Sequence, residues 1–211
     1  MSFATRDRTI LRQLNNLIGD PYVASYFYYE GSKKDENSQK LCIYGYLLPR
    51  TAPYKYGSYK VCITLCGDFP FKRPKMILLT HIYHPAVGNS SSTSVYCSEC
   101  CEREWSSVTK ISRMIEHFVI AIDHPEDAST YCVMNKEAKR LYEQDRAKYE
   151  ATALQMVRKF AYPRPDSAIV SLKGAAKRMI CTQLGFNCAQ INRLPLSNGL
   201  KKYLDPTMDL A

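Results

Sequence analysis

Three cysteines stand within five positions in the middle of the chain, in the segment CSECC that contains Cys97, Cys100 and Cys101. A serine-rich run precedes them, and Trp105, the only tryptophan in the sequence, follows them. Closely spaced thiols can hold a zinc ion, one thiol can act as a nucleophile, or all can pack as small apolar side chains. The rest of the sequence must decide between these three chemistries.

A structural zinc site needs four ligands, usually from two closely spaced pairs. Cys97 and Cys100 supply one pair, but the six cysteines outside the segment CSECC offer no second pair, and His81 and His84 lie at the exit of a predicted strand. We therefore expect no metal site and no other cofactor. Cys100 and Cys101 are expected to pack or to face solvent.

The composition narrows the class of protein. The formal net charge is +9, from 29 basic and 20 acidic residues, but no arginine-rich run or recognition helix concentrates it, so no nucleic-acid partner is expected. No apolar run approaches the roughly 20 residues that span a bilayer. Charges interrupt the apolar pattern of the first 20 residues, which is not typical of a secretory signal. We expect an intracellular protein with reduced thiols, in the cytoplasm or the nucleus and away from membranes.

The elements that must position these residues begin with a helix and continue with strands. Leucine and isoleucine at helical spacing predict an amphipathic helix over 9–18, with Ile10, Leu11, Leu14, Leu17 and Ile18 on one face. Short aromatic and β-branched runs predict strands at 22–30, 40–48, 58–65 and 75–80. Residues 31–39 are predicted as a polar turn, and the serine-rich segment 88–94 as a loop.

After Trp105 the apolar period becomes helical. It predicts one helix over 111–122, ended by the segment DHPED, and a longer helical segment over 138–160. The segment YPRPD at 162–166 breaks this pattern, because proline cannot extend a helix. A run of strands followed by a run of helices predicts an α+β domain over residues 1–165 and a separate tail over 166–211.

Several short motifs occur in a distinctive order, and the chain resembles the ubiquitin-conjugating enzymes over roughly residues 5–165. The motifs that carry this resemblance are Tyr-x-x-Gly, FPFKRPK, IYHP, the cysteine, the tryptophan, DHPED and YEQDRAKYE. The resemblance implies the family's fold: an N-terminal helix, a four-stranded antiparallel meander and C-terminal helices. It also implies a transferase that works with ubiquitin, a ubiquitin-activating enzyme and RING- or HECT-type ligases.

The resemblance selects one cysteine as the nucleophile. In this family a tryptophan follows the ubiquitin-accepting cysteine by about eight residues, and Trp105 lies eight positions after Cys97. The family's histidine-proline-asparagine motif becomes His84, Pro85 and Ala86, so the asparagine is lost. That amide steadies the oxyanion as lysine attacks, or holds the active-site loop. Two readings follow: a carrier with impaired transfer to lysine, or a weak or inactive site that acts as an adaptor.

Other family positions carry over residue by residue. Ser129, or Asp127, falls near a polar residue that receives the incoming amine, although Ser129 also suits a helix cap. Asn89 is a candidate substitute donor, but asparagine in a loop commonly forms turns. Further correspondences concern partners: Arg8 and Arg12 for the activating enzyme, Phe71 for ligases unless it is core, and Ser106 and Ser107, where the usual proline is missing, for the second ligase loop.

The tail over 166–211 resembles the suppressor-of-cytokine-signalling box, which docks elongin and a cullin. Leu172, Ala176 and Ile180 recur at helical spacing and match the elongin-binding half, with Ala176 where a cysteine is usual. The cullin-binding half is matched by Leu194, Pro195, Leu196, Leu200, Tyr203 and Leu204. The resemblance implies recruitment to an assembly of elongin B/C and cullin. A tail that folds back onto the main domain is the other interpretation.

Overall fold

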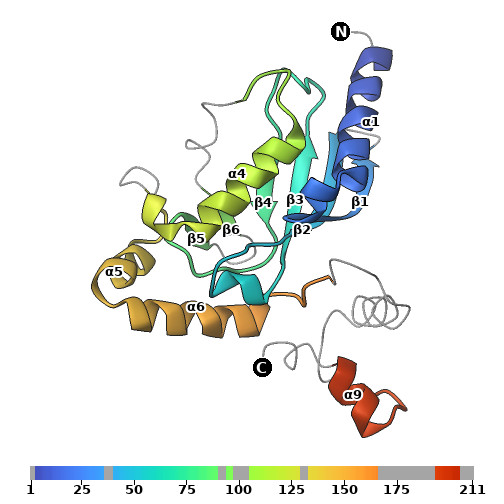
Figure 1. Cartoon of the computed structure of the whole chain (residues 1–211). Helices are drawn as coiled ribbons and strands as arrows, with labels where there is room; N and C mark the ends of the chain where they lie inside the picture. Colours follow the sequence, from blue (N-terminus) through green and yellow to red (C-terminus); the bar gives the residue numbers. More distant parts are fainter. Residues whose placement is uncertain are drawn as a thin grey trace. The chain divides into compact units, whose positions relative to one another are not determined.

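The structure, a computed structural model, describes residues 3–35, 40–89, 94–96, 105–128, 133–165 and 193–204. The chain divides into two compact units, Met1–Ala161 and Tyr162–Ala211. Figure 1 shows the order of the elements along the chain. The first unit has the predicted α+β architecture, and the second contains the helix α9 (Asn198–Leu204).

An antiparallel sheet forms the centre of the first unit (Figure 1). Its first four strands form the predicted meander: β1 (Phe27–Asp35), β2 (Lys40–Leu47), β3 (Tyr59–Leu65) and β4 (Lys75–Leu78). Two short strands extend the sheet, in the order β1-β2-β3-β4-β6-β5: β5 (Val87–Asn89) and β6 (Ser94–Tyr96). The serine-rich segment, predicted as a loop, therefore begins and ends in strands.

The start of β1 differs from the prediction. Residues 22–24, expected as strand, belong to the short helix α2 (Pro21–Ala24), because Asp20 accepts a hydrogen bond from the Tyr22 N–H at 2.9 Å and proline is compatible with the first helical position. The strand then continues through Gly31–Asp35, which was predicted as a turn, because these residues pair with β2. Strand pairing thus overrides their polar composition.

The first helix, α1 (Phe3–Gly19), is confirmed, but part of its predicted apolar face is wrong. Ile10 and Leu17 are buried, whereas Leu11 and Ile18 are about 60% exposed. The buried stripe instead includes Arg6 and Gln13, which bond to distant backbone groups: Arg6 donates to the Cys66 carbonyl at 3.2 Å, and Gln13 Oε1 accepts from the Ile111 N–H at 2.9 Å. Polar side chains take core positions here because they complete backbone hydrogen bonds.

The helix α4 (Ile111–Asp123) covers one face of the sheet, crossing β4 and β6 in Figure 1. Its apolar face packs as predicted, and a 3₁₀ turn, η2 (Pro125–Asp127), follows it. The predicted long helix over 138–160 is in fact two helices, α5 (Lys136–Gln144) and α6 (Arg146–Phe160). Asp145 separates them because its backbone leaves the helical region and its carboxylate accepts from the Lys148 N–H at 3.0 Å.

The core lies between α4 and the sheet. It consists of aliphatic side chains with 0% exposure, including Ile43, Leu47, Ile63, Leu65, Leu78, Ile111, Ile115 and Ile122. Full burial of each such side chain contributes about 1.5–3 kcal/mol to folding. Among the described residues, no helix has both the length and the apolar character needed to cross a bilayer.

Candidate active site

The turn formed by His84, Pro85 and Ala86 lies between β4 and β5 and is buried. The Ala86 N–H donates to His84 Nδ1 at 3.1 Å, and the Val87 N–H donates to the His84 carbonyl at 3.2 Å. These two bonds close the turn upon itself. Because Nδ1 accepts a hydrogen bond, the ring proton of the neutral imidazole must sit on Nε2.

His84 is held neutral at physiological pH. Burial lowers its pKa to about 3. The backbone groups of Ile122 and Ala121 oppose this shift and raise the pKa. Within the described part of the chain, Nε2 itself has no hydrogen-bond partner. The ring also packs against Tyr54, with 5.6 Å between centroids. His84 is therefore a structural part of the turn and is not suited to carry a proton in catalysis near neutral pH.

A backbone clamp joins this turn to the start of α5. The Pro85 carbonyl accepts hydrogen bonds from the N–H groups of Met134 at 3.0 Å and Asn135 at 2.9 Å. Asn135 in turn caps α5, because its Oδ1 accepts from the Ala138 N–H at 3.0 Å. The chain that follows residues 129–132 is thereby fixed against the turn. No sequence pattern indicated this contact, since backbone groups carry it.

The sheet brings the approach to Cys97 beside the same turn. Tyr96, which immediately precedes Cys97, pairs with Val87, which immediately follows Ala86. Directly opposed residues of antiparallel strands have Cα atoms about 4.5–5.5 Å apart. Cys97, Cys100 and Cys101 themselves lie outside the described residues.

Trp105 anchors the chain on the far side of these cysteines. Its Nε1–H donates to the Pro70 carbonyl at 3.0 Å, and its ring lies 6.0 Å from that of Phe69, centroid to centroid. The described residues on either side of positions 97–104 are thus held in place, Tyr96 by its pairing with Val87 and Trp105 by its hydrogen bond to Pro70.

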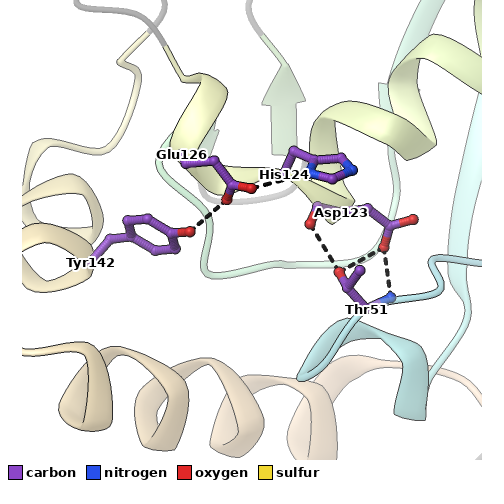
Figure 2. A network of polar contacts seen from close by, with 5 residues as sticks. All are labelled: Thr51, Asp123, His124, Glu126 and Tyr142. Atoms are coloured by element: carbon purple, nitrogen blue, oxygen red, sulfur yellow. Dashed lines mark hydrogen bonds and ion pairs between the residues drawn. The ribbon is translucent and has the colours of Figure 1, made fainter.

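Figure 2 shows a polar network that holds the end of α4 and the turn after it. The Asp123 carboxylate accepts from the N–H groups of Arg50 at 2.8 Å and Thr51 at 2.9 Å, and the Thr51 hydroxyl lies 2.9 Å from the same oxygen. This contact joins residues 72 positions apart. It fixes the end of α4 to the loop between β2 and β3.

The second half of the network centres on Glu126 (Figure 2). Its carboxylate accepts from the Tyr142 hydroxyl at 2.5 Å and lies 3.1 Å from His124 Nδ1. The hydrogen bond from Tyr142, followed by bonds from its own backbone N–H and from His124, lowers the pKa of Glu126 to about 2. The reciprocal hydrogen bond to Glu126 raises the pKa of His124. Glu126 therefore ties η2 to α5 as an anion.

Comparison with known proteins identifies the family. The family model for ubiquitin-conjugating enzymes matches residues 22–157. The chain belongs to the ubiquitin-conjugating enzyme family. It is 31% identical over 121 residues to ubiquitin-conjugating enzyme E2 ubc-18 of Caenorhabditis elegans, which covers 57% of this chain and 75% of that protein. It also resembles, with a TM-score of 0.61 and 19% identity, a crystal structure assigned to a ubiquitin-conjugating enzyme of Plasmodium yoelii, over 76% of this chain and 98% of that one.

As a member of this family of ubiquitin transferases, the protein is expected to meet an activating enzyme and ligases. Arg8 and Arg12 lie on the exposed side of α1. Phe71 is not core: its side chain is 67% exposed. Ser106 and Ser107 are exposed as well, and the hydrogen bond from Trp105 to the Pro70 carbonyl brings them and Phe71 to one region.

The remaining predicted positions are only partly described. Ser129, Leu172, Ala176 and Ile180 lie outside the described residues. The helix cap predicted near Ser129 is supplied by Asn135. In the second unit, α9 begins after Ser197, whose hydroxyl accepts from the Leu200 N–H at 3.4 Å; Tyr203 and Leu204 end the helix. Pro195 and Leu200 are exposed, and Leu194 and Leu196 are half-buried.

The described residues hold no group of three or more metal-ligating side chains. The sequence did not indicate three contacts that hold this region: Asn135 with the turn, Thr51 with Asp123 at the end of α4, and Tyr142 with Glu126. An aspartate at the end of a helix was visible in the sequence, but its partner 72 positions away was not.

Proposed function

We propose that this protein accepts ubiquitin as a thioester on Cys97 and passes it on. The supporting observation is the pairing of Tyr96 with Val87, which sets the residue before Cys97 beside the turn of His84, Pro85 and Ala86. In this step the Cys97 thiolate attacks the thioester carbonyl of ubiquitin on the activating enzyme. A new C–S bond forms, the old C–S bond breaks, and the departing thiolate on the activating enzyme takes up a proton.

Transfer from Cys97 to lysine is expected to be slow because Ala86 offers no amide donor. Loss of one oxyanion donor costs about 2.7–4 kcal/mol, or two to three decades in rate, in acyl transfer. Asn89, three residues after Ala86, is a weak substitute for the missing amide donor, since it belongs to β5 and pairs with Ser94. Transfer of ubiquitin to a ligase with its own cysteine is favoured instead, because there a thiol rather than an amine attacks the thioester on Cys97. Ser129 remains a candidate for receiving an incoming amine.

The test is a charging reaction with activating enzyme, ATP and ubiquitin, followed on a non-reducing gel. The wild type should give a band that a thiol reductant removes, and Cys97→Ser should lose this reducible band. Cys100→Ser and Cys101→Ser are the matched controls and should keep it. A reducible band that survives Cys97→Ser would assign the thioester to another cysteine.

A second candidate function is a catalytically weak adaptor that presents a substrate to a ligase assembly. The loss of the family asparagine at Ala86 favours it. The same gel separates the two candidates, because an adaptor gives no ubiquitin band even with active enzyme and ATP.

We further propose that residues 166–211 recruit elongin B/C and a cullin, while residues 1–165 form the conjugating domain. The helix α9, preceded by the segment of Leu194, Pro195 and Leu196, supports a short partner-binding helix in the cullin-facing half. Co-purification of the full chain with elongins B and C is the test. Leu172→Asp should abolish elongin binding and Leu200→Asp should reduce only cullin binding. Elongin binding that survives Leu172→Asp would exclude the predicted helix face.

A further inference from the structure

A groove of about 410 Å³ lies where the beginning of α4 meets the chain that leads into β4. This volume is within the usual range of ligand sites, about 300–1,000 Å³. Four basic side chains are among its described lining residues: Arg73, Lys110, Arg113 and His117. None of these residues belongs to the machinery that sequence reasoning proposed.

The four basic residues converge from two separate segments. Lys110, Arg113 and His117 follow one another at i, i+3 and i+7, which places them on one face of α4. Arg73 comes from the loop that follows Phe71. The tertiary fold, not a basic run in the sequence, therefore concentrates positive charge in this groove.

The groove favours anions. No carboxylate is among its described lining residues, and Lys110 makes no ion pair within the described part of the chain. Arg113 contacts Glu116 through Nη1 at 3.0 Å, but Glu116 also accepts a hydrogen bond from Tyr22. Arg113 is 60% exposed at its side chain, so its guanidinium remains open to further hydrogen bonds.

The beginning of α4 adds to the same potential. Lys110 occupies the N-cap without a side-chain capping bond, and the first turn contains no acidic residue. The positive end of the helix dipole therefore keeps no neutralising carboxylate of its own. This field adds to the charges of Arg73, Lys110 and Arg113.

Trp105 gives the groove a flat apolar wall. Its indole N–H is used by the Pro70 carbonyl, and Phe69 packs near the ring, so the ring orientation is fixed. Met114 adds a second apolar surface. Cations beside an aromatic wall suit a ligand with both acidic and apolar side chains.

The same tryptophan connects the groove to the proposed ligase surface. Pro70, which accepts the indole hydrogen bond, directly precedes Phe71, and Trp105 directly precedes Ser106. A ligase that covers Phe71 and Ser106 would therefore place a neighbouring segment of its own chain in the groove.

We propose that this groove binds an acidic, apolar-containing peptide segment of the ligase that docks at Phe71, an inference that rests on the proposed function for the identity of the partner. The cations pair with carboxylates of the segment, and an apolar side chain packs on Trp105. The groove thereby selects among ligases by charge.

Because Trp105 is the only tryptophan, its fluorescence reports occupancy of the groove directly. The probe is a synthetic peptide of six glutamates and two central leucines, without tryptophan or tyrosine. It is titrated into the full chain without ubiquitin on Cys97. We expect a saturable change in Trp105 emission that added salt weakens. A peptide with glutamine in place of glutamate should give no saturable change.

Two matched charge-removal pairs locate the binding. Lys110→Gln with Arg113→Gln should weaken peptide binding about fivefold or more, whereas Lys33→Gln with Lys34→Gln, on exposed positions of β1, should change it less than about twofold. Thermal unfolding of each pair confirms an intact fold.

Equal loss in both pairs would overturn the proposal, because binding would then follow net charge rather than the groove. Tighter binding of a twelve-nucleotide single-stranded DNA, lost with the same groove pair, would also overturn it and assign the groove to nucleic acid. The probe is added to protein that carries no ubiquitin. A peptide that does not bind would therefore not contradict thioester formation on Cys97. A failed charging reaction likewise leaves the peptide titration valid.

Discussion

The backbone N–H of Asn135 donates a 2.9 Å hydrogen bond to the carbonyl oxygen of Pro85, and that of Met134 donates to the same atom. The family's asparagine at the position of Ala86 would serve either to hold the active-site loop or to stabilise the oxyanion. Here backbone bonds already tie the start of α5 to the turn without a side-chain amide. The substitution by Ala86 is therefore expected to cost catalysis more than structure.

The first prediction concerns Ala86→Asn. Restoring the amide should speed the discharge of ubiquitin from Cys97 onto free lysine by about tenfold or more, because an oxyanion donor contributes about two to three decades in similar sites. Single-turnover discharge of the preformed thioester measures it. Ala86 is only 2% exposed, so Ala86→Leu controls for added volume and should not gain rate. Equal discharge in wild type and Ala86→Asn would remove the oxyanion role.

The fold was predictable where apolar periodicity was strong and local. β2, β3, β4 and α4 lie where the sequence predicted them, since their buried side chains recur at the strand or helix period. Errors arose where tertiary contacts decide. Gly31–Asp35 are strand only because β2 pairs with them, and Asp145 ends a helix that periodicity alone would continue.

The candidate site was predictable as a set of motifs but not as a geometry. The motif residues His84 and Pro85 could be found in the sequence, and Phe71 is exposed as a ligase contact requires. Sequence could not reveal that Pro85 binds Asn135 or that Lys110 and Arg73 line one groove, because these contacts join distant segments. Such pairs depend on the completed fold.

A second prediction separates loading from transfer. Phe71→Ala should leave thioester formation unchanged but reduce ligase-dependent discharge by about tenfold or more, since an exposed aromatic anchor commonly contributes 2 kcal/mol or more to an interface. At 67% exposure its removal leaves no cavity in the core. Leu79→Ala, at a partly exposed apolar position, is the control. Discharge unaffected by Phe71→Ala would place the ligase surface elsewhere.

The third prediction tests the contact between Asp123 and Thr51. Asp123→Ala should lower the free energy of unfolding by about 2 kcal/mol, because charged hydrogen bonds contribute about 1.5–3 kcal/mol and this contact is only partly buried. Urea denaturation measures the change. Asp127→Ala, at an exposed position four residues away, should stay within about 0.5 kcal/mol of wild type. Equal effects would mean that the carboxylate does not hold the loop.

The last prediction is a pH dependence at Glu126. Its pKa in the folded protein, about 2, lies below the ordinary value of 4.5, and the Tyr142 hydroxyl is the largest cause. The folded state therefore binds the proton less readily than the unfolded state. Its contribution to stability is fully present above pH 4.5 and is lost as the pH falls towards 2.

Tyr142→Phe removes only this hydroxyl, since the phenyl ring can still pack against Arg146, which lies 3.9 Å from the ring centroid. The stability difference from wild type should be small, at most about 1 kcal/mol for an exposed pair, and should shrink to nothing between pH 4.5 and 2. Urea unfolding at a series of pH values measures it, with Tyr56→Phe as an exposed control. A difference that is constant with pH would show that the hydroxyl acts by packing and not through the Glu126 carboxylate.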